Sequence, residues 1–294
     1  VIFENVTINS PESYVGIIAQ APSGALIDNV HVTGDIAISG YGYVGGIVGH
    51  GYPTVNNCSV IGNSPENKGT ITANYWGAGA ILGFSGDYGS KVNNATVKNV
   101  EIHGNYGGAA SVTGSPYGAA VNGANVSDVT ITSNSDYCMG YVAAGGTVSN
   151  VTISNVTATA NGAPITPADA VAAIGENVYF TFAEALAAAK AGDVIELLAN
   201  VAGDFVVNEG QSIIIDLNGY DIVGSIHAIT NNGTLVINDT VGTGNVYTTD
   251  VSAQGRATIV NNGTITINGG WFGDSNNDTT DRNAINRGNA IKNY

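Results

Sequence analysis

The chain has 294 residues, a formal net charge of −15, 41 glycines and 35 asparagines, with 44% hydrophobic and 11% charged residues. The hydrophobic content excludes a disordered acidic tail, the scarcity of charge excludes a coiled coil, and two cysteines exclude a disulfide-bonded scaffold. Eight basic residues cannot form the cationic surface that nucleic-acid binding needs, and no apolar run approaches the roughly 18 residues of a membrane span. We therefore expect no nucleic-acid partner and no membrane span in this sequence.

A short β-branched run around an asparagine recurs through the first half, with a mean spacing of 29 residues. The copies are centred on Asn5, Asn29, Asn57, Asn94 and Asn150, with a degenerate copy at Val121–Val126. One coil of such strands cannot bury its own apolar face, whereas a stack of coils buries a continuous core. Asparagine tolerates left-handed backbone, which suits the bend between two strands. The repeat therefore predicts a parallel β-solenoid.

A second repeated unit, led by an aromatic residue and rich in small residues, alternates with the first. Its copies begin at Tyr14, Tyr43, Trp76 and Tyr141. The segment Gly42–Gly49, followed by Val55–Gly62, resembles the GLUG motif of bacterial surface proteins, which pairs a Val-Gly-Gly-Leu-Val-Gly core with an Asn-Cys strand. The resemblance implies a repeat-built extracellular protein and no catalytic residues. Because the sequence opens inside a strand-like pattern and ends at Asn293-Tyr294 without a recognisable closing element, we expect a piece of a longer protein.

A proline-rich stretch at residues 161–168 divides the chain into segments 1–160 and 169–294, and we expect it to be a linker. After it, Thr181 and Glu184 form a capping box that predicts a short helix near residues 182–191. This region resembles the N-terminal cap of pectin-lyase-like right-handed β-helices. A continuous solenoid with an inserted helix is the alternative to two separate solenoids. Overall we predict an all-β fold, a right-handed parallel β-helix with one capping helix.

The second segment also contains a near-identical pair of runs, residues 229–238 and 259–268, offset by 30 residues. In both runs the sequence Asn-Asn-Gly-Thr is flanked by alternating aliphatic residues. We expect these runs to occupy equivalent places in successive coils.

Aromatic residues beside glycines are frequent in the first half, and rings exposed on a rigid face are suited to stacking on sugars. The candidate sugar-binding residues are Tyr41, Tyr43, Tyr52, Tyr75, Trp76 and Tyr88, with Tyr106 and Tyr117 in similar surroundings. The alternative is that these rings stack on one another and only fill the corners of the coils.

Oxygen-bearing side chains at Asp274, Asn276 and Asp278 have a one-three-five spacing that suits a hard cation such as Ca²⁺, with Asp281 nearby. The alternative is a polar surface loop, because the glycine and glutamate of an EF-hand are absent from this segment. Calcium is the one cofactor that the sequence suggests.

We expect an extracellular, adhesin-like bacterial surface protein whose rigid scaffold binds glycans or a host surface. The alternatives are a polysaccharide lyase or hydrolase and a purely structural stalk. The sequence gives no catalytic residue: Gly49-His50-Gly51 matches one polygalacturonase element, but the other elements of that family are missing, and we interpret it as a turn.

Overall fold

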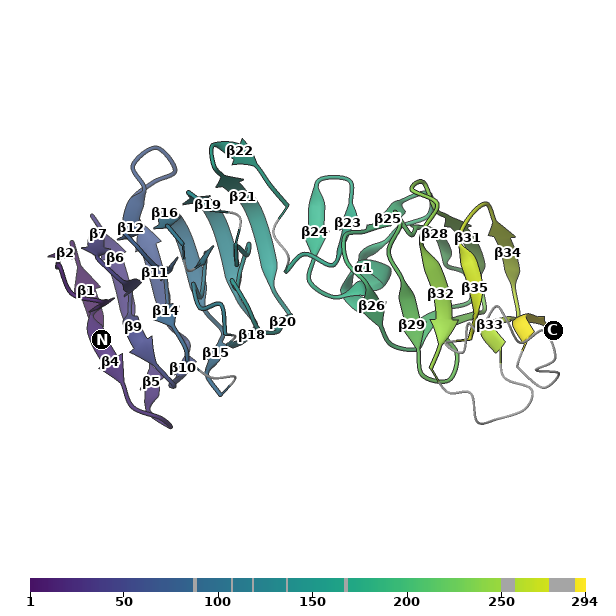
Figure 1. Cartoon of the computed structure of the whole chain (residues 1–294), viewed down its shortest axis with the longest axis horizontal. Helices are drawn as coiled ribbons and strands as arrows, with labels where there is room; N and C mark the ends of the chain where they lie inside the picture. The colour runs from purple at the N-terminus through teal and green to yellow at the C-terminus, as the bar shows by residue number, and fades with distance from the viewer. Residues whose placement is uncertain are drawn as a thin grey trace. The chain divides into compact units, whose positions relative to one another are not determined.

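The computed structural model describes residues 1–86, 89–106, 108–117, 119–135, 137–166, 169–249, 257–274 and 289–294. Over these residues the chain is all-β, a parallel β-solenoid of about nine turns with one short helix, which confirms the predicted fold class (Figure 1). It divides into two compact units, Val1–Asp169 and Ala170–Tyr294, called the first and second units below.

The main sheet of the first unit is parallel and takes two strands from each of its early coils (Figure 1). In the later coils the two strands merge into one strand of nine residues. The first set is β1 (Ile2–Glu4), β6 (His31–Gly34) and β11 (Ser59–Gly62); the second set is β2 (Thr7–Asn9), β7 (Ala37–Gly40) and β12 (Gly69–Ala73); the merged strands are β16 (Thr96–Gly104), β19 (Asn125–Ser133) and β21 (Thr152–Ala160).

Three narrower parallel sheets complete the coils of the first unit. The first contains β5 (Leu26–Asp28), β10 (Thr54–Asn56), β15 (Lys91–Asn93), β18 (Ala120–Asn122) and β20 (Val148–Ser149). The second contains β3 (Tyr14–Val15), β8 (Tyr43–Gly45), β13 (Ala78–Gly79) and β17 (Ala109–Ala110), and the third contains β4 (Ile18–Ala21), β9 (Val48–Gly51) and β14 (Leu82–Phe84).

The core of the first unit consists of aliphatic rows that run from coil to coil. Ile38 pairs with Ile71 and Ile71 with Ile102, and each is at most 1% exposed. Because parallel strands in register place equivalent residues about 4.8 Å apart, each coil covers the apolar residues of its neighbour.

Asparagines occupy the bend between β10 and β11 and the equivalent bends of other coils. Asn29, Asn57, Asn94 and Asn150 all have φ between 52° and 55°, as predicted for left-handed bends. Gly123 takes this place in the degenerate copy, with φ 77°.

Asn5 has the left-handed backbone expected at a bend, with φ 55°, but its predicted equivalence with Asn29 and Asn57 is wrong. The register of β1 on β6 aligns Asn5 with Gly34, at a second bend of the coil, and its Oδ1 accepts a hydrogen bond from the Asp35 N–H at 3.0 Å. Asn99 and Asp128 lie at this second bend in later coils, also with left-handed φ. Two rows of bends therefore exist where the repeat suggested one.

The sheet that contains β3 and β8 and the sheet that contains β9 come so close at Gly45 and Gly49 that no side chain fits between them. A Cβ atom on Gly45 would lie 1.9 Å from the Val48 carbonyl oxygen, and one on Gly49 would lie 2.6 Å from the Val15 nitrogen. The small residues of the GLUG-like segment are thus required by direct backbone contact between two sheets.

The last coil of the first unit is closed by a carboxylate. The N–H groups of Tyr141, Val142 and Ala143 donate to Asp169 at 2.8, 2.8 and 3.1 Å. One coil earlier, the Val112 N–H donates to the carbonyl oxygen of Val142 instead. Asp169 therefore replaces the carbonyls of a further coil. Part of the expected linker is also ordered, since β22 (Ala163–Pro164) pairs with β21 in antiparallel fashion.

The second unit has three parallel sheets (Figure 1). The first contains β25 (Val194–Leu197), β28 (Ser212–Asp216), β31 (Thr234–Asn238) and β34 (Thr264–Ile267), with β23 (Ala172–Ile174) and β24 (Asn177–Tyr179) added at one edge as an antiparallel hairpin. The second contains β26 (Val201–Ala202), β29 (Ile222–Gly224), β32 (Asn245–Thr248) and β35 (Trp271–Asp274), and the third contains β27 (Phe205–Val207), β30 (Ile229–Asn231), β33 (Ala257–Asn261) and β36 (Asn289–Asn293).

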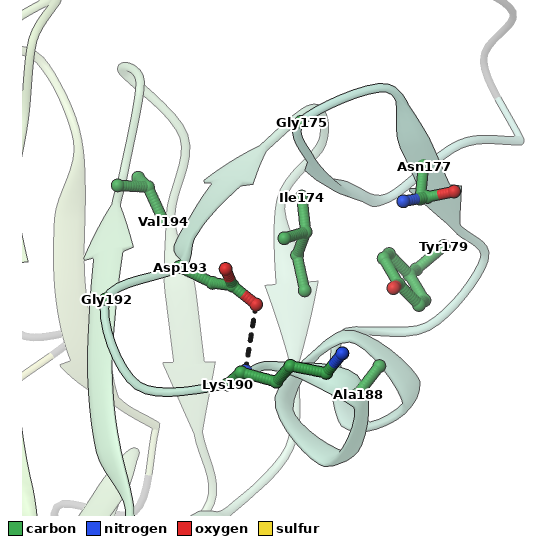
Figure 2. Close-up of a pocket in the computed structure, with 9 residues that line it drawn as sticks. All are labelled: Ile174, Gly175, Asn177, Tyr179, Ala188, Lys190, Gly192, Asp193 and Val194. Atoms are coloured by element: carbon green, nitrogen blue, oxygen red, sulfur yellow. Dashed lines mark hydrogen bonds between the residues drawn. The ribbon is translucent and has the colours of Figure 1, made fainter.

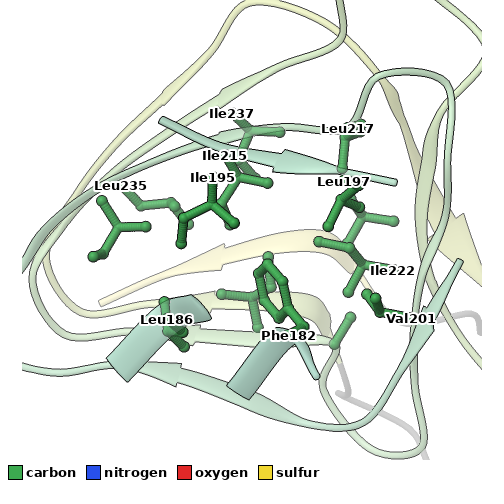
Figure 3. Packing of buried hydrophobic residues seen from close by; sticks show 14 of the residues in the cluster. Phe182, Leu186, Ile195, Leu197, Val201, Ile215, Leu217, Ile222, Leu235 and Ile237 are labelled. Atoms are coloured by element: carbon green, nitrogen blue, oxygen red, sulfur yellow. The ribbon is translucent and has the colours of Figure 1, made fainter. Parts of the chain in front are cut away.

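The predicted helix is confirmed as α1 (Phe182–Ala188). Thr181 caps it by accepting a hydrogen bond from the Glu184 N–H at 3.2 Å. Phe182 and Leu186 lie on its buried face, and Figure 3 shows both beside the aliphatic side chains of the strands. The helix therefore covers the core of the second unit at its N-terminal coil. No helix among the described residues is long and apolar enough to cross a membrane.

The internal repeat of the second unit is confirmed in register, because Ile229 pairs with Ile259 and Thr234 with Thr264. The repeat also forms a ladder of amides, in which Asn231 and Asn261 are buried. The side-chain nitrogen of Asn231 donates to Asn261, and that of Asn261 donates to Asn293, at 2.6 and 3.0 Å.

Candidate functional site

Ten rings of the first unit form one continuous cluster, which we call the aromatic array. Within the described residues, each ring has its centroid within 6.0 Å of at least one other ring of the set. The members are Tyr14, Tyr41, Tyr43, His50, Tyr52, Tyr75, Trp76, Phe84, Tyr106 and Tyr117. The array crosses successive coils, so the solenoid fixes the spacing of its rings.

An exposed row of tyrosines forms one side of the array. Tyr41 and Tyr75 are stacked with centroids 5.3 Å apart and planes 4° apart, and Tyr106 meets Tyr75 at 5.6 Å, tilted by 64°. Their exposed fractions are 48%, 38% and 55%. Trp76, 38% exposed, lies against Tyr75 at 4.7 Å. These four residues keep much of their ring surface in water.

Tyr43 anchors the exposed rings to the scaffold. It begins β8 and packs between Trp76 and Phe84, at 5.9 and 4.2 Å. Burial, with smaller contributions from neighbouring phenols such as Tyr117, raises the pKa of Tyr43 to about 12. The Tyr43 phenol therefore stays protonated at neutral pH, and the array carries no charge at this position.

His50 lies inside the array, and the interpretation of Gly49-His50-Gly51 as a turn is wrong. All three residues belong to β9, which pairs with β4 and β14. The His50 ring is stacked on Phe84 at 5.2 Å and lies 4.3 Å from Tyr14. Burial lowers the pKa of His50 below its ordinary value.

A pocket of about 370 Å³ opens beside His50. Its wall consists of Gln20, Ala21, Pro22, Ser23, His50 and Tyr52. The wall combines apolar surface with hydroxyl, amide and imidazole groups, and it includes no acidic or basic side chain other than the histidine. Such a composition suits an uncharged polar ligand.

The structure brings together most of the predicted sugar-binding residues. Tyr41, Tyr43, Tyr52, Tyr75 and Trp76 all belong to the aromatic array, whereas Tyr88 lies outside the described residues. The alternative that the rings stack on one another is confirmed by these contacts, and sugar binding stays a prediction.

Sequence reasoning missed three members, Tyr14, His50 and Phe84. A signal existed for Tyr14, which leads the same repeat unit as Tyr43 and pairs with it. Phe84 pairs with His50 in the next coil, and only that register reveals their contact.

The second unit also has a pocket, of about 470 Å³, between the β23–β24 hairpin and the end of α1 (Figure 2). Tyr179, Lys190 and Asp193 contribute to its wall. The Lys190 N–H donates to the Asp193 carboxylate at 2.9 Å, which fixes the turn between the helix and β25. This carboxylate is therefore already engaged by the backbone.

The structure does not test the predicted calcium site at residues 274–281. Asn276, Asp278 and Asp281 lie outside the described residues, and only the backbone of Asp274, at the end of β35, is described. Elsewhere in the described ranges, no cluster of three or more His, Cys, Asp or Glu side chains could hold a metal ion. Calcium binding at residues 274–281 stays a prediction from the sequence.

The chain is thus a β-solenoid that carries a continuous aromatic surface on its first unit. In comparisons with known proteins, no family model, no curated protein and no solved structure matches the chain.

Proposed function

We propose that the first unit is a carbohydrate-binding scaffold and that the aromatic array is its binding surface. The observation that carries the proposal is the exposure of rings within a fixed array. Six of its ten described members are between 38% and 55% exposed, namely Tyr14, Tyr41, Tyr75, Trp76, Tyr106 and Tyr117. Rings that served only to fill a corner of the coil would be buried, because their exposed apolar surface costs free energy.

Sugars suit this surface better than other ligands do. The ring faces provide apolar area for the C–H face of a pyranose, and the phenol hydroxyls provide hydrogen bonds at the edges. Residues 1–160 contain three basic and nine acidic residues, so polyanions are repelled. An uncharged glycan is therefore the favoured ligand class.

The rigid scaffold lowers the entropic cost of binding a glycan. Each exposed ring is fixed by ring contacts and by a parallel strand or bend, so little conformational entropy is lost when a ligand binds. Together with the GLUG-like repeats, this arrangement supports a role in adhesion at a bacterial cell surface, outside the cell.

A glycan array tests the proposal. We expect the full chain to bind one or more uncharged glycans, and the triple variant Tyr41→Ala/Tyr75→Ala/Tyr106→Ala to lose at least about tenfold in affinity. Trp271→Ala is the matched control, because Trp271 is 39% exposed on β35 of the second unit. Absence of binding to every glycan on the array would leave the structural stalk as the better interpretation.

The alternative of a polysaccharide-active enzyme has less support. Glycoside hydrolysis needs paired carboxylates at a defined separation. The pocket beside His50 has no carboxylate in its wall. Release of reducing sugars from a bound glycan would overturn this preference.

A further inference from the structure

We propose that the pocket beside His50 is a subsite that binds one uncharged sugar ring of the glycan and holds it by a hydrogen bond from the His50 imidazole edge. This inference rests on the proposed function, and it adds the location and the chemistry of a specific contact at one end of the aromatic array.

The stacking of His50 leaves only its edge available to a ligand. Phe84 is stacked on the imidazole with planes 10° apart, and Tyr14 lies 4.3 Å from it with planes 34° apart. Tyr52 stands nearly perpendicular to it, at 75° and 6.0 Å. The imidazole therefore cannot offer a face to a sugar, in contrast to the exposed tyrosines, and it can take part only through its ring nitrogens.

The neighbouring glutamine favours one tautomer of the His50 imidazole. The amide nitrogen of Gln20 lies 3.4 Å from Nδ1 of His50. An amide nitrogen donates and does not accept, so Nδ1 is the acceptor. Neutral His50 then carries its proton on Nε2, which becomes a donor. Burial favours this neutral form by lowering the pKa of His50.

The remainder of the wall matches the other needs of a sugar ring. Tyr52 and Pro22 provide apolar surface, and the Ser23 hydroxyl can donate or accept a hydrogen bond. No carboxylate or ammonium group lines the pocket, so a uronate or an amino sugar would lose its hydration there without gaining an ion pair. The chemistry of the wall selects a neutral sugar.

The test uses the full chain with cellohexaose, mannohexaose, xylohexaose and hexagalacturonate as probes. His50→Phe keeps a flat ring between Tyr14 and Phe84 and removes the donor. His103→Phe is the matched control, because His103 is also a partly exposed strand histidine, and its Nδ1 lies 2.8 Å from the Thr132 hydroxyl. We expect His50→Phe to weaken binding of the tightest uncharged probe about tenfold and the control to leave it unchanged.

A second measurement does not depend on the folding of a variant. In nitrogen NMR spectra of the wild-type imidazoles, saturation with the same probe should shift the Nε2 signal of His50 and leave both signals of His103 in place. Unchanged His50 signals, or tighter binding of hexagalacturonate than of every uncharged probe, would overturn the subsite. If the triple tyrosine variant loses binding while His50→Phe does not, the subsite is wrong and the proposed function stands. If no probe and no glycan on the array binds, the subsite and the proposed carbohydrate-binding function are both wrong.

Discussion

The ring of Tyr43 lies 4.2 Å from the ring of Phe84, although the two residues belong to different sheets of the first unit. Tyr43 is on β8 and Phe84 is on β14, which is paired with β9. Direct backbone contact at Gly45 and Gly49 holds these sheets together, and the aromatic side chains pack where space allows. The contact therefore links the glycine-rich repeat to the aromatic surface.

Removing the Tyr43 ring should destabilise the first unit more than removing an exposed ring. Tyr43→Ala loses contacts with both Trp76 and Phe84, and we expect a loss of about 2–3 kcal/mol in the free energy of unfolding. Tyr41→Ala should cost less than about 1 kcal/mol, because that ring is half exposed and has one stacked neighbour. Urea denaturation followed by circular dichroism measures both values. Equal losses would show that Tyr43 is not an anchor.

A methyl group at Gly45 should disrupt the contact between the two sheets. Its Cβ atom would lie 1.9 Å from the Val48 carbonyl oxygen, which is backbone and cannot move aside easily. We expect Gly45→Ala to cost about 3 kcal/mol. Gly89→Ala is the control, because nothing lies within 4 Å of a Cβ atom there. Thermal denaturation of the two variants should differ clearly, and similar curves would contradict the close packing.

The bend at Asn57 should depend on both its backbone conformation and its side chain. Asn57 has φ 52°, its amide nitrogen donates to Asp28 at 3.0 Å, and its oxygen accepts from Asn94 at 3.3 Å. Asn57→Gly keeps the left-handed conformation and loses only these hydrogen bonds. Asn57→Ala loses the hydrogen bonds and also disfavours the left-handed conformation. We expect the alanine variant to be less stable than the glycine variant by about 1 kcal/mol. A reversed order in chemical denaturation would show that strain at this bend is unimportant.

Asp169 should give the stability of the first unit a distinctive pH dependence. The residue is partly exposed, but its carboxylate is enclosed, and burial raises its pKa to about 6 in spite of three backbone hydrogen bonds. The folded state then binds the proton more tightly than the unfolded state does. The contribution of Asp169 to stability therefore falls as pH rises from about 4 to about 6, by about 3 kcal/mol, and is constant above that range.

Asp169→Ala isolates this effect. It leaves the N–H groups of Tyr141, Val142 and Ala143 without their acceptor and should lower stability. The difference between the wild-type and variant free energies of unfolding, measured from pH 4 to pH 8, should shrink as pH rises to 6. A difference that grows over this interval would mean that the carboxylate is stabilised in its charged form.

The repeat predicted the solenoid because each coil repeats the same alternation of strand and bend, and the capping box predicted α1 because its signal is local. The place of Asn5 was not predictable in this way. Either bend of a coil can be occupied by an asparagine, as at Asn57 and Asn99, and local sequence does not distinguish the two bends. Only the pairing of Ile2 with His31 settles the register.

The sequence predicted most of the aromatic residues of the array, but it did not predict which rings contact one another. Tyr43 and Phe84 are 41 residues apart, and their contact depends on how closely the glycines allow two sheets to approach. The glycines that flank His50 favour a turn in the sequence. Gly51 in fact has φ 144° inside a strand, where a Cβ atom would lie 2.1 Å from the Ala21 carbonyl oxygen.

Calorimetric titration of the full chain with the tightest-binding uncharged glycan tests the central claim most directly. The proposal predicts saturable binding with a negative heat-capacity change, because apolar ring surface is covered. It also predicts that Tyr41→Ala/Tyr75→Ala/Tyr106→Ala abolishes most of this binding while Trp271→Ala does not. Equal affinity of the triple variant and the wild type would contradict the assignment of the aromatic array as the binding surface.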